Sequence, residues 1–231
     1  MDATLAHRIK DLIGFDYSAD TANMMTEDEA LETACAEVID TLPDSLLLQY
    51  AVAPTAIDST NPDTDFASEG KRVLRVIRRQ NQYAHDGDGI YRVCQEVDID
   101  AFEEMKDTNS IYHPTPHSPI YTIDPGDGTS YLKILPEINS SAKDAKVYYI
   151  AYPTGADIDA GTGVDGLPNE VEHAIALKAS VYILQTLVSD AVQDEEDEEM
   201  LNMLQTQLQS LIAMYTAELA RLTKGEGVPA Q

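Results

Sequence analysis

The sequence is poor in several features that would each point to a class of protein. It has no tryptophan and only 6% aromatic residues, so its core is expected to be mainly aliphatic. Its two cysteines, Cys35 and Cys94, lie far apart, which favours two buried thiols in a reduced, cytoplasmic setting over a disulfide. Nothing resembles a signal peptide, and no apolar run approaches the roughly 18 residues of a membrane-spanning helix. We therefore expect no membrane partner.

Basic residues are also scarce: the chain contains 15 lysines and arginines but 41 aspartates and glutamates, and its formal net charge is −26. Such a charge repels nucleic acids and anionic lipid at long range. It is unevenly spread: residues 1–70 carry 15 acids and 2 bases, residues 71–153 carry 12 and 10, and residues 154–231 carry 14 and 3. Two acidic outer segments thus flank a nearly neutral middle, which predicts a domain boundary on each side.

The N-terminal segment has helical periodicity. Thr26 followed by Glu29 predicts a capping box at a helix start, and Pro43 ends the apolar pattern behind it. A short helix is expected over 44–52, and residues 53–70, full of turn formers, are expected to be a linker. The apolar positions that carry the periodicity are Leu5, Ile9, Leu12 and Ile13 in an opening helix, then Leu31, Cys35, Val38 and Leu42.

The middle of the chain has the composition of β-structure. Eight of its twelve tyrosines fall between Tyr83 and Tyr152, and short β-branched runs alternate with turn signals. Five or six strands at this spacing predict a small antiparallel sandwich or barrel, with a helical turn over 102–110.

Helical periodicity returns after a Gly/Asp loop at 155–166. One helix is predicted from Pro168 to about Asp190, and a longer one is predicted to open with the acidic run 194–199, which suits the positive end of a helix dipole. The apolar seam of the longer helix comprises Leu201, Leu204, Leu208, Leu211, Tyr215 and Leu222.

These patterns predict an α+β protein in which a helical bundle is interrupted by an antiparallel β insertion. The expected parts are residues 1–60 as the first part of the bundle and 66–153 as the β domain. Residues 155–224 are expected to complete the bundle, and 225–231 to form a flexible tail.

No constellation of residues indicates catalysis, a metal or a cofactor. The carboxylates lie mostly in loops and on polar helix faces, and successive acids at 194–199 point in different directions on a helix. His113 and His117 are separated by prolines in an extended stretch, which would hold their rings roughly 13 Å apart. The Gly/Asp loops do not match the ligand spacing of a calcium-binding loop. We therefore expect a protein that is not an enzyme and binds no cofactor.

The stretch KRVLRVIRRQ at 71–80 holds five of the basic residues, and as a strand it carries arginine on both faces. One interpretation is an edge strand protected by charge against unwanted pairing. Another is an interface in which Arg72, Arg75, Arg78 and Arg79 meet the acidic surface of a neighbouring copy or of a tail protein. Contact with DNA is a third, disfavoured by the surrounding charge.

The order of these segments resembles a head-to-tail adaptor, the neck or connector protein of a tailed bacteriophage. The resemblance rests on EALETACAEVIDTLPDSLLLQYAV, KRVLRVIRRQ, GIYRVCQEV, NSIYHPTPHSPIYTI, KVYYIAYPT and the two closing helical segments, and it spans nearly the whole chain. It implies a virion protein, assembled in the host cytoplasm, that forms a homo-oligomeric ring of about twelve subunits below the portal. Double-stranded DNA would pass through its channel, and downstream tail or nozzle proteins would bind it.

The resemblance also implies a role for the C-terminal segment. The C-terminal segment would contact the portal protein, through Lys224, Val228, Pro229 and Gln231. We also hypothesise that carboxylates of the 155–170 loop, Asp157, Asp159 and Asp165, or carboxylates of the bundle face the channel, where they would repel DNA and let it slide. Two alternatives remain open: another tail or baseplate component, or an acidic protein that mimics DNA.

Overall fold

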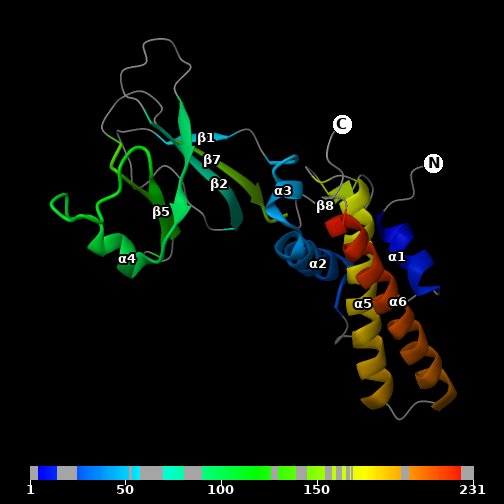
Figure 1. Cartoon of the computed structure of the whole chain (residues 1–231). Coiled ribbons are helices and arrows are strands. Elements are labelled where there is room, and N and C mark those ends of the chain that lie inside the picture. Colours follow the sequence, from blue (N-terminus) through cyan, green and yellow to red (C-terminus); the bar gives the residue numbers. More distant parts are fainter. Residues whose placement is uncertain are drawn as a thin grey trace. The chain divides into compact units, whose positions relative to one another are not determined.

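The computed structural model describes residues 5–14, 25–51, 54–57, 70–80, 90–125, 130–138, 145–153, 158–159, 163–164, 167, 169–193 and 198–224. The chain forms two compact units, which are coloured along the sequence in Figure 1. Residues 1–50 and 152–231 form a helical unit, and residues 51–151 form a β unit. The predicted α+β class, with a sheet-containing insertion in a helical bundle, is confirmed.

The helical unit contains α1 (Leu5–Ile13), α2 (Glu27–Thr41), α3 (Asp44–Leu47), α5 (Asn169–Gln193) and α6 (Glu198–Lys224). The predicted capping box is present, since the Thr26 hydroxyl accepts from the Glu29 amide and the Glu29 carboxylate accepts from the Thr26 amide. α3 is shorter than the helix expected over 44–52. A two-stranded hairpin of β8 (Ile158–Asp159) and β9 (Gly163–Val164) lies in the segment expected to be a loop.

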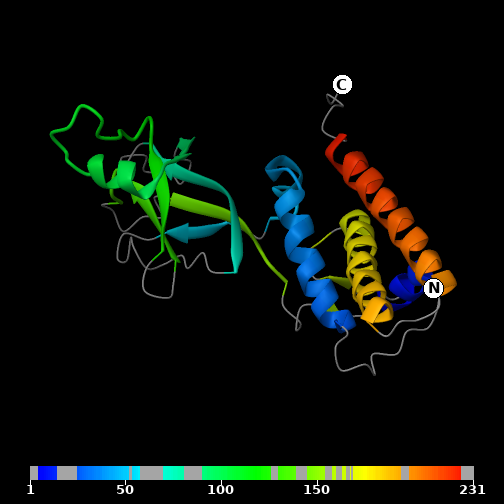
Figure 2. The same ribbon diagram turned by 90° about the horizontal axis from the view of Figure 1, so that it is seen from below.

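α5 is the central helix of this unit and packs against α1, α2 and α6 (Figures 1 and 2). Contrary to our expectation, its residues Glu170–Val192 are long and apolar enough to cross a membrane, with a mean hydropathy of 1.3 over the best window. Half of that window is buried within the structure, and Lys178 in this helix pairs with a carboxylate of α2. The burial pattern is that of the core helix of a bundle.

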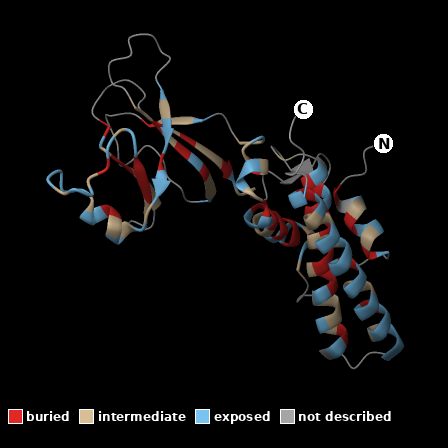
Figure 3. Ribbon diagram, in the orientation of Figure 1, coloured by how far each residue is buried: buried red, intermediate tan, exposed pale blue. Residues whose placement is uncertain are grey.

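α6 buries one narrow stripe, as its heptad-like spacing predicted. Leu204, Leu211 and Leu222 are buried, whereas Met203 and Ile212 beside them are exposed. In Figure 3 most of α6 is coloured as exposed. The helix begins at Glu198, so only Glu198 and Glu199 of the acidic run lie in its first turn; residues 194–197 lie outside the described residues.

The β unit contains two sheets. β1 (Thr55–Ile57), β7 (Ala145–Ala151), β2 (Lys71–Arg79) and β3 (Tyr91–Val93) form an antiparallel four-stranded sheet in that order. β4 (Gln95–Glu96), β5 (Ile120–Pro125) and β6 (Ser130–Leu135) form a three-stranded sheet, in which β4 and β5 are parallel. The prediction of a purely antiparallel domain is therefore wrong for this pair.

The β unit has three layers. Ile57, Val76 and Val147 of the four-stranded sheet pack in one core with Leu132 and Ile134 of the three-stranded sheet. On the other face of the three-stranded sheet, α4 (Ile99–Glu104) packs through Phe102 onto Ile120 and Leu135. The order of layers is thus four-stranded sheet, three-stranded sheet, α4.

The unit boundaries differ from those indicated by composition. The β unit begins at Ala51 instead of residue 66, and it ends at Ala151 instead of 153. Strand β1 lies within the stretch that we expected to be a linker, where it pairs Thr55–Ile57 with the start of β7. A three-residue strand among turn-forming residues carries too little periodicity to be predicted.

Candidate interaction surface

The arginine-rich strand β2 lies in the interior of its sheet. It is hydrogen-bonded to β7 on one side and to β3 on the other, so the interpretation of a charged edge strand is wrong. The register with β7 shifts between Val73 and Arg75, and this bulge interrupts the simple alternation of faces. Beyond the bulge, Val76 and Arg78 face the core, whereas Arg75, Ile77 and Arg79 lie on the opposite, outer face.

Arg78 is an internal side chain and not part of an exposed patch. It is only 2% exposed. Its Nε donates to the Pro136 carbonyl at 3.0 Å, its Nη1 to the Arg79 carbonyl at 3.2 Å and its Nη2 to the Glu137 carbonyl at 3.3 Å. A buried guanidinium needs such acceptors, because an unsatisfied charged donor is costly. The expectation that Arg78 contacts another subunit is therefore wrong.

The outer face of the four-stranded sheet is basic and aromatic. Arg75 is exposed and lies opposite Tyr148, while Arg72 and Arg79 are half-buried. The Lys146 ammonium lies 4.7 Å from the centroid of the Tyr91 ring, within the range of a cation–π contact. Beside them, Val93 is 52% exposed. We call Arg75, Arg79, Tyr91, Val93, Lys146 and Tyr148 the basic sheet face.

Charge is strictly segregated within this sheet. Its four strands contain seven of the chain's fifteen basic residues and none of its forty-one carboxylates. A surface of this kind attracts carboxylates, and arginine forks bind them with two hydrogen bonds. Of the four predicted interface arginines, Arg75 has the exposure that such a role requires, whereas Arg72 and Arg79 have it in part.

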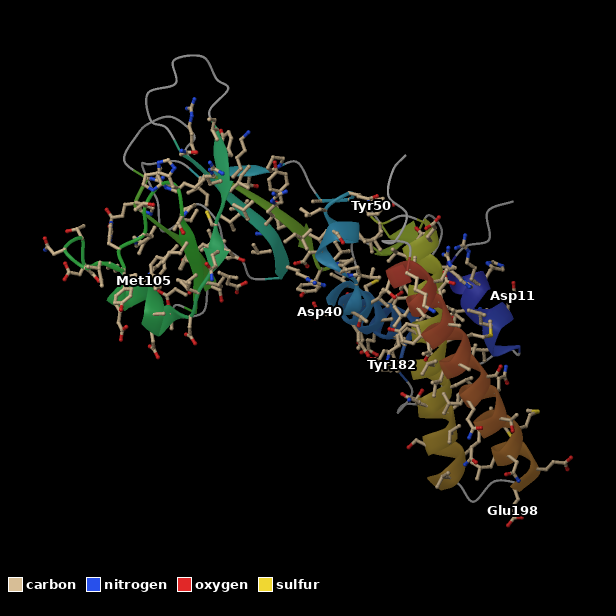
Figure 4. All side chains as sticks on the ribbon, viewed as in Figure 1. Asp11, Asp40, Tyr50, Met105, Tyr182 and Glu198 are labelled. Atoms are coloured by element: carbon tan, nitrogen blue, oxygen red, sulfur yellow. The ribbon has the colours of Figure 1, made fainter. Side chains whose placement is uncertain are left out.

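Sequence reasoning missed a polar cluster in the helical unit. The Lys178 ammonium on α5 lies 2.8 Å from the Glu37 carboxylate on α2, and the Tyr182 hydroxyl donates to the same carboxylate. The Lys178 nitrogen also lies 4.9 Å from the Tyr182 ring and 5.2 Å from the ring of Tyr215 on α6. Tyr182 is labelled in Figure 4, together with Asp40, which accepts a hydrogen bond from Tyr152. No local motif signals the cluster, because its members are distant in sequence.

The cluster shifts the pKa values of its acids. Burial would raise the pKa of Glu37, but hydrogen bonds from Lys178 and Tyr182, together with the Lys178 charge, outweigh it and lower that pKa. Burial, followed by the hydrogen bond to Glu37 and its charge, raises the pKa of Tyr182 to about 12. Burial and the Glu37 charge also raise the pKa of Tyr215. These shifts accompany an ion-pair cluster that joins three helices, α2, α5 and α6.

The other predicted site residues are only partly described. Lys224 is the exposed last residue of α6, and Val228, Pro229 and Gln231 lie outside the described residues. Asp157 and Asp165 also lie outside them. Asp159 lies in β8, of which the backbone alone is described. The β8–β9 hairpin contacts α2 and α5, so this part of the acidic loop is seated on the helical unit.

Within the described residues, the remaining candidates for chemistry have ordinary structural partners. No group of three or more His, Cys, Asp or Glu side chains there could hold a metal ion. The His113 Nδ1–H donates to the Met105 carbonyl at 3.0 Å, whereas the His117 Nδ1 accepts from the Gln80 amide at 2.7 Å. Cys35 and Cys94 are free and buried, and burial raises the pKa of each thiol to about 12. The predicted pair of buried thiols is confirmed.

Comparison with protein families, with curated proteins and with solved structures gives no match to this chain.

Proposed function

We propose that this chain is a virion structural protein, a head-to-tail adaptor that forms a homo-oligomeric ring below the portal of a tailed bacteriophage. The observation that carries the proposal is its architecture. A β unit of residues 51–151 is inserted into a helical unit built from both ends of the chain, in the order of segments on which the sequence resemblance rests. The larger head-to-tail adaptors combine a helical bundle with an inserted β domain.

The charge distribution supports passage of DNA without binding. The helical unit holds only five of the fifteen basic residues, Arg8, Lys10, Lys178, Arg221 and Lys224, and Lys178 is paired with Glu37. Phosphate contacts from lysine and arginine supply most nonspecific DNA affinity, so an acidic wall lets the duplex slide. In this proposal, carboxylates of the 155–170 loop, including Asp157, Asp159 and Asp165, line the channel.

The proposed partners are the portal protein and a downstream tail or nozzle protein. The C-terminal segment beginning at Lys224 and continuing through Val228, Pro229 and Gln231 contacts the portal. The basic sheet face, with Arg75 exposed, contacts another protein subunit, because the chain's own excess of carboxylates offers it a complementary surface.

Negative-stain electron microscopy of the full chain, alone and co-expressed with the portal protein of the same genome, tests the proposal. We expect a ring of about twelve subunits with an axial pore, stacked on the portal. Threefold or sixfold symmetry would instead indicate a tail or baseplate component. A monomer that ignores the portal and binds a nucleic-acid enzyme would favour the DNA mimic.

A further inference from the structure

The two outer layers of the β unit have opposite charge. One is the basic sheet face of the four-stranded sheet. The other comprises α4 and its flanks, residues 98–107, which expose five carboxylates and one lysine: Asp98, Asp100, Glu103, Glu104, Asp107 and Lys106. The lysine is already paired with Glu103 at 2.5 Å. Because the three-stranded sheet and the core separate the two layers, the acidic and basic surfaces lie on opposite sides of one compact unit.

An apolar tip lies beside the acidic surface. Ile111 is 89% exposed and Tyr112 is 70% exposed, although both are large apolar side chains; they lie in the loop between α4 and β5. Hydrogen bonds fix this loop: the Asn109 amide donates to the Asp107 carboxylate at 2.9 Å, and the Tyr112 amide donates to the Ser110 hydroxyl at 3.2 Å. A cavity of about 270 Å³, lined in part by Tyr112 and Pro114, adjoins the tip. A fixed, exposed tyrosine is typical of a protein interface, since little ordering entropy is lost on binding.

We infer that the basic sheet face of one copy binds the acidic α4 surface and the Ile111–Tyr112 tip of the next copy. This inference rests on the proposed homo-oligomer and adds the two surfaces that meet in it. The carboxylates Asp100 and Glu104 face Arg75 and Lys146 across the contact. The tip covers the apolar part of the basic sheet face, where Val93 is exposed. The occupant is a second copy because this one chain carries both complementary surfaces.

The contact is heterologous, which means that different surfaces of the two copies meet. A heterologous contact repeats from copy to copy and closes into a ring when the rotation between copies permits it. Opposite charge on opposite sides of the β unit also disfavours a symmetric dimer, in which each surface would meet its own kind and like charges would repel. The charge arrangement therefore selects head-to-tail stacking.

Reciprocal charge reversal tests the inference on the full chain. One variant, R75E/K146E, reverses the basic sheet face, and the other, D100K/E104K, reverses the α4 surface. Each variant alone should lose self-association by about a hundredfold or more, because like charges then meet. A mixture of the two should assemble again, since every contact in an alternating ring is complementary. Lys10→Glu, which reverses an exposed charge on α1, is the matched control and should assemble like the unmodified chain.

The apolar tip has its own test. I111S/Y112S should weaken self-association by about tenfold or more while leaving the melting temperature of the dissociated chain unchanged, because both side chains are exposed in the single copy. Assembly of every variant would be measured by mass photometry, alone and with the portal protein. Rings that form equally from all variants, or a mixture that fails to assemble, would overturn the inference and leave the proposed function standing. An unmodified chain that stays monomeric in both settings would overturn both.

Discussion

The ammonium group of Lys178 lies 2.8 Å from the carboxylate of Glu37, so that a cation of α5 is paired with an anion of α2 inside the helical unit. The side chain of Lys178 is 15% exposed and that of Glu37 is 44% exposed, which places the pair at the border between buried and surface ion pairs. The ring of Tyr215, 5.2 Å from the same ammonium, brings α6 into the contact. Because α6 buries only a narrow leucine stripe, this cluster also specifies how it docks.

Replacing Lys178 by alanine should lower the free energy of unfolding of the helical unit by about 1–2 kcal/mol, because Glu37 loses its cation while remaining half-buried. Solvent screening of Glu37 keeps the loss below that of a fully buried pair. Thermal melts would show a drop of roughly 2–8 °C. Lys10→Ala, on the exposed side of α1, should change the stability by less than about 0.5 kcal/mol. Equal melting temperatures for the two variants would contradict a structural role for the pair.

The same cluster predicts how stability depends on pH. The pKa of Glu37 is lower in the folded chain than its ordinary value of 4.5, so its contribution is present above about pH 4.5 and is lost as the pH falls through the folded value. The pKa of Tyr182 is raised from 10.0 to about 12, so its contribution is present below pH 10 and is lost as the pH rises toward 12. Denaturant unfolding of Glu37→Gln should show a weaker loss in acid, and that of Tyr182→Phe a weaker loss in base. If the free energy of unfolding of both variants changed with pH as it does in the unmodified chain, Glu37 and Tyr182 would not contribute to the pH dependence of stability.

Truncation of two arginines of one strand, Arg78 and Arg75, should affect stability to very different extents. Arg78→Ala is expected to destabilise the β unit by about 2–4 kcal/mol, because it removes a fully buried side chain and leaves the Pro136 and Glu137 carbonyls without its hydrogen bonds. Arg75→Ala should change stability by less than about 0.5 kcal/mol, since its side chain is exposed. Chemical denaturation of both variants measures the difference. A stable Arg78→Ala protein would contradict the internal role of this guanidinium.

The start of α2 depends on its capping box. Thr26→Ala should cost about 0.5–2 kcal/mol, because the Glu29 amide loses the threonine hydroxyl as its acceptor. Thr26→Ser keeps that acceptor and should restore most of the loss. Circular dichroism melts of the three proteins would decide the matter, and a serine variant as unstable as the alanine variant would exclude capping as the cause.

The two thiols report on the two units separately. Cys35 lies in the helical unit and Cys94 in the β unit, and burial raises the pKa of each to about 12. Because the thiolate is the reactive form, both should resist a thiol reagent at neutral pH in the native chain and react on unfolding. Single-cysteine variants, Cys35→Ala and Cys94→Ala, would show which unit opens first in denaturant. Rapid labelling of the native protein would contradict the observed burial.

Much of the secondary structure could be predicted because its causes are local. The spacing of Leu5, Ile9 and Ile13 predicted α1, and the pairing of Thr26 with Glu29 placed the start of α2. β-branched and aromatic runs likewise predicted five or six strands in the middle of the chain, where β2, β5, β6 and β7 are found. In contrast, β1 was not predicted. Its three residues, Thr55–Ile57, lie among turn formers and are held in an extended conformation by pairing with β7.

The surface that we propose for assembly could be predicted only in part. The concentration of arginine at 71–79 is visible in the sequence, and alternation placed Arg75 and Arg78 on opposite faces of the strand, but it could not show which face is buried. Which face of β2 is covered depends on the three-stranded sheet, whose strands β5 and β6 lie more than 40 residues further along the chain. The role proposed for the acidic layer on α4 and for the tip at Ile111 and Tyr112 could not be inferred from the sequence. It depends on the order of layers, which places the acidic surface on the side opposite the basic sheet face.

The sequence by itself determined the α+β class, the insertion of a β segment between helical segments, the capping chemistry and the segregation of charge, because each depends on composition or on neighbours within a few residues. The tertiary structure alone decided that β2 is an inner strand, that Arg78 is buried while Arg75 is exposed, and that Lys178 meets Glu37. Those relationships join residues far apart in the chain, and the free energy that selects them comes from packing and desolvation, which no local pattern encodes.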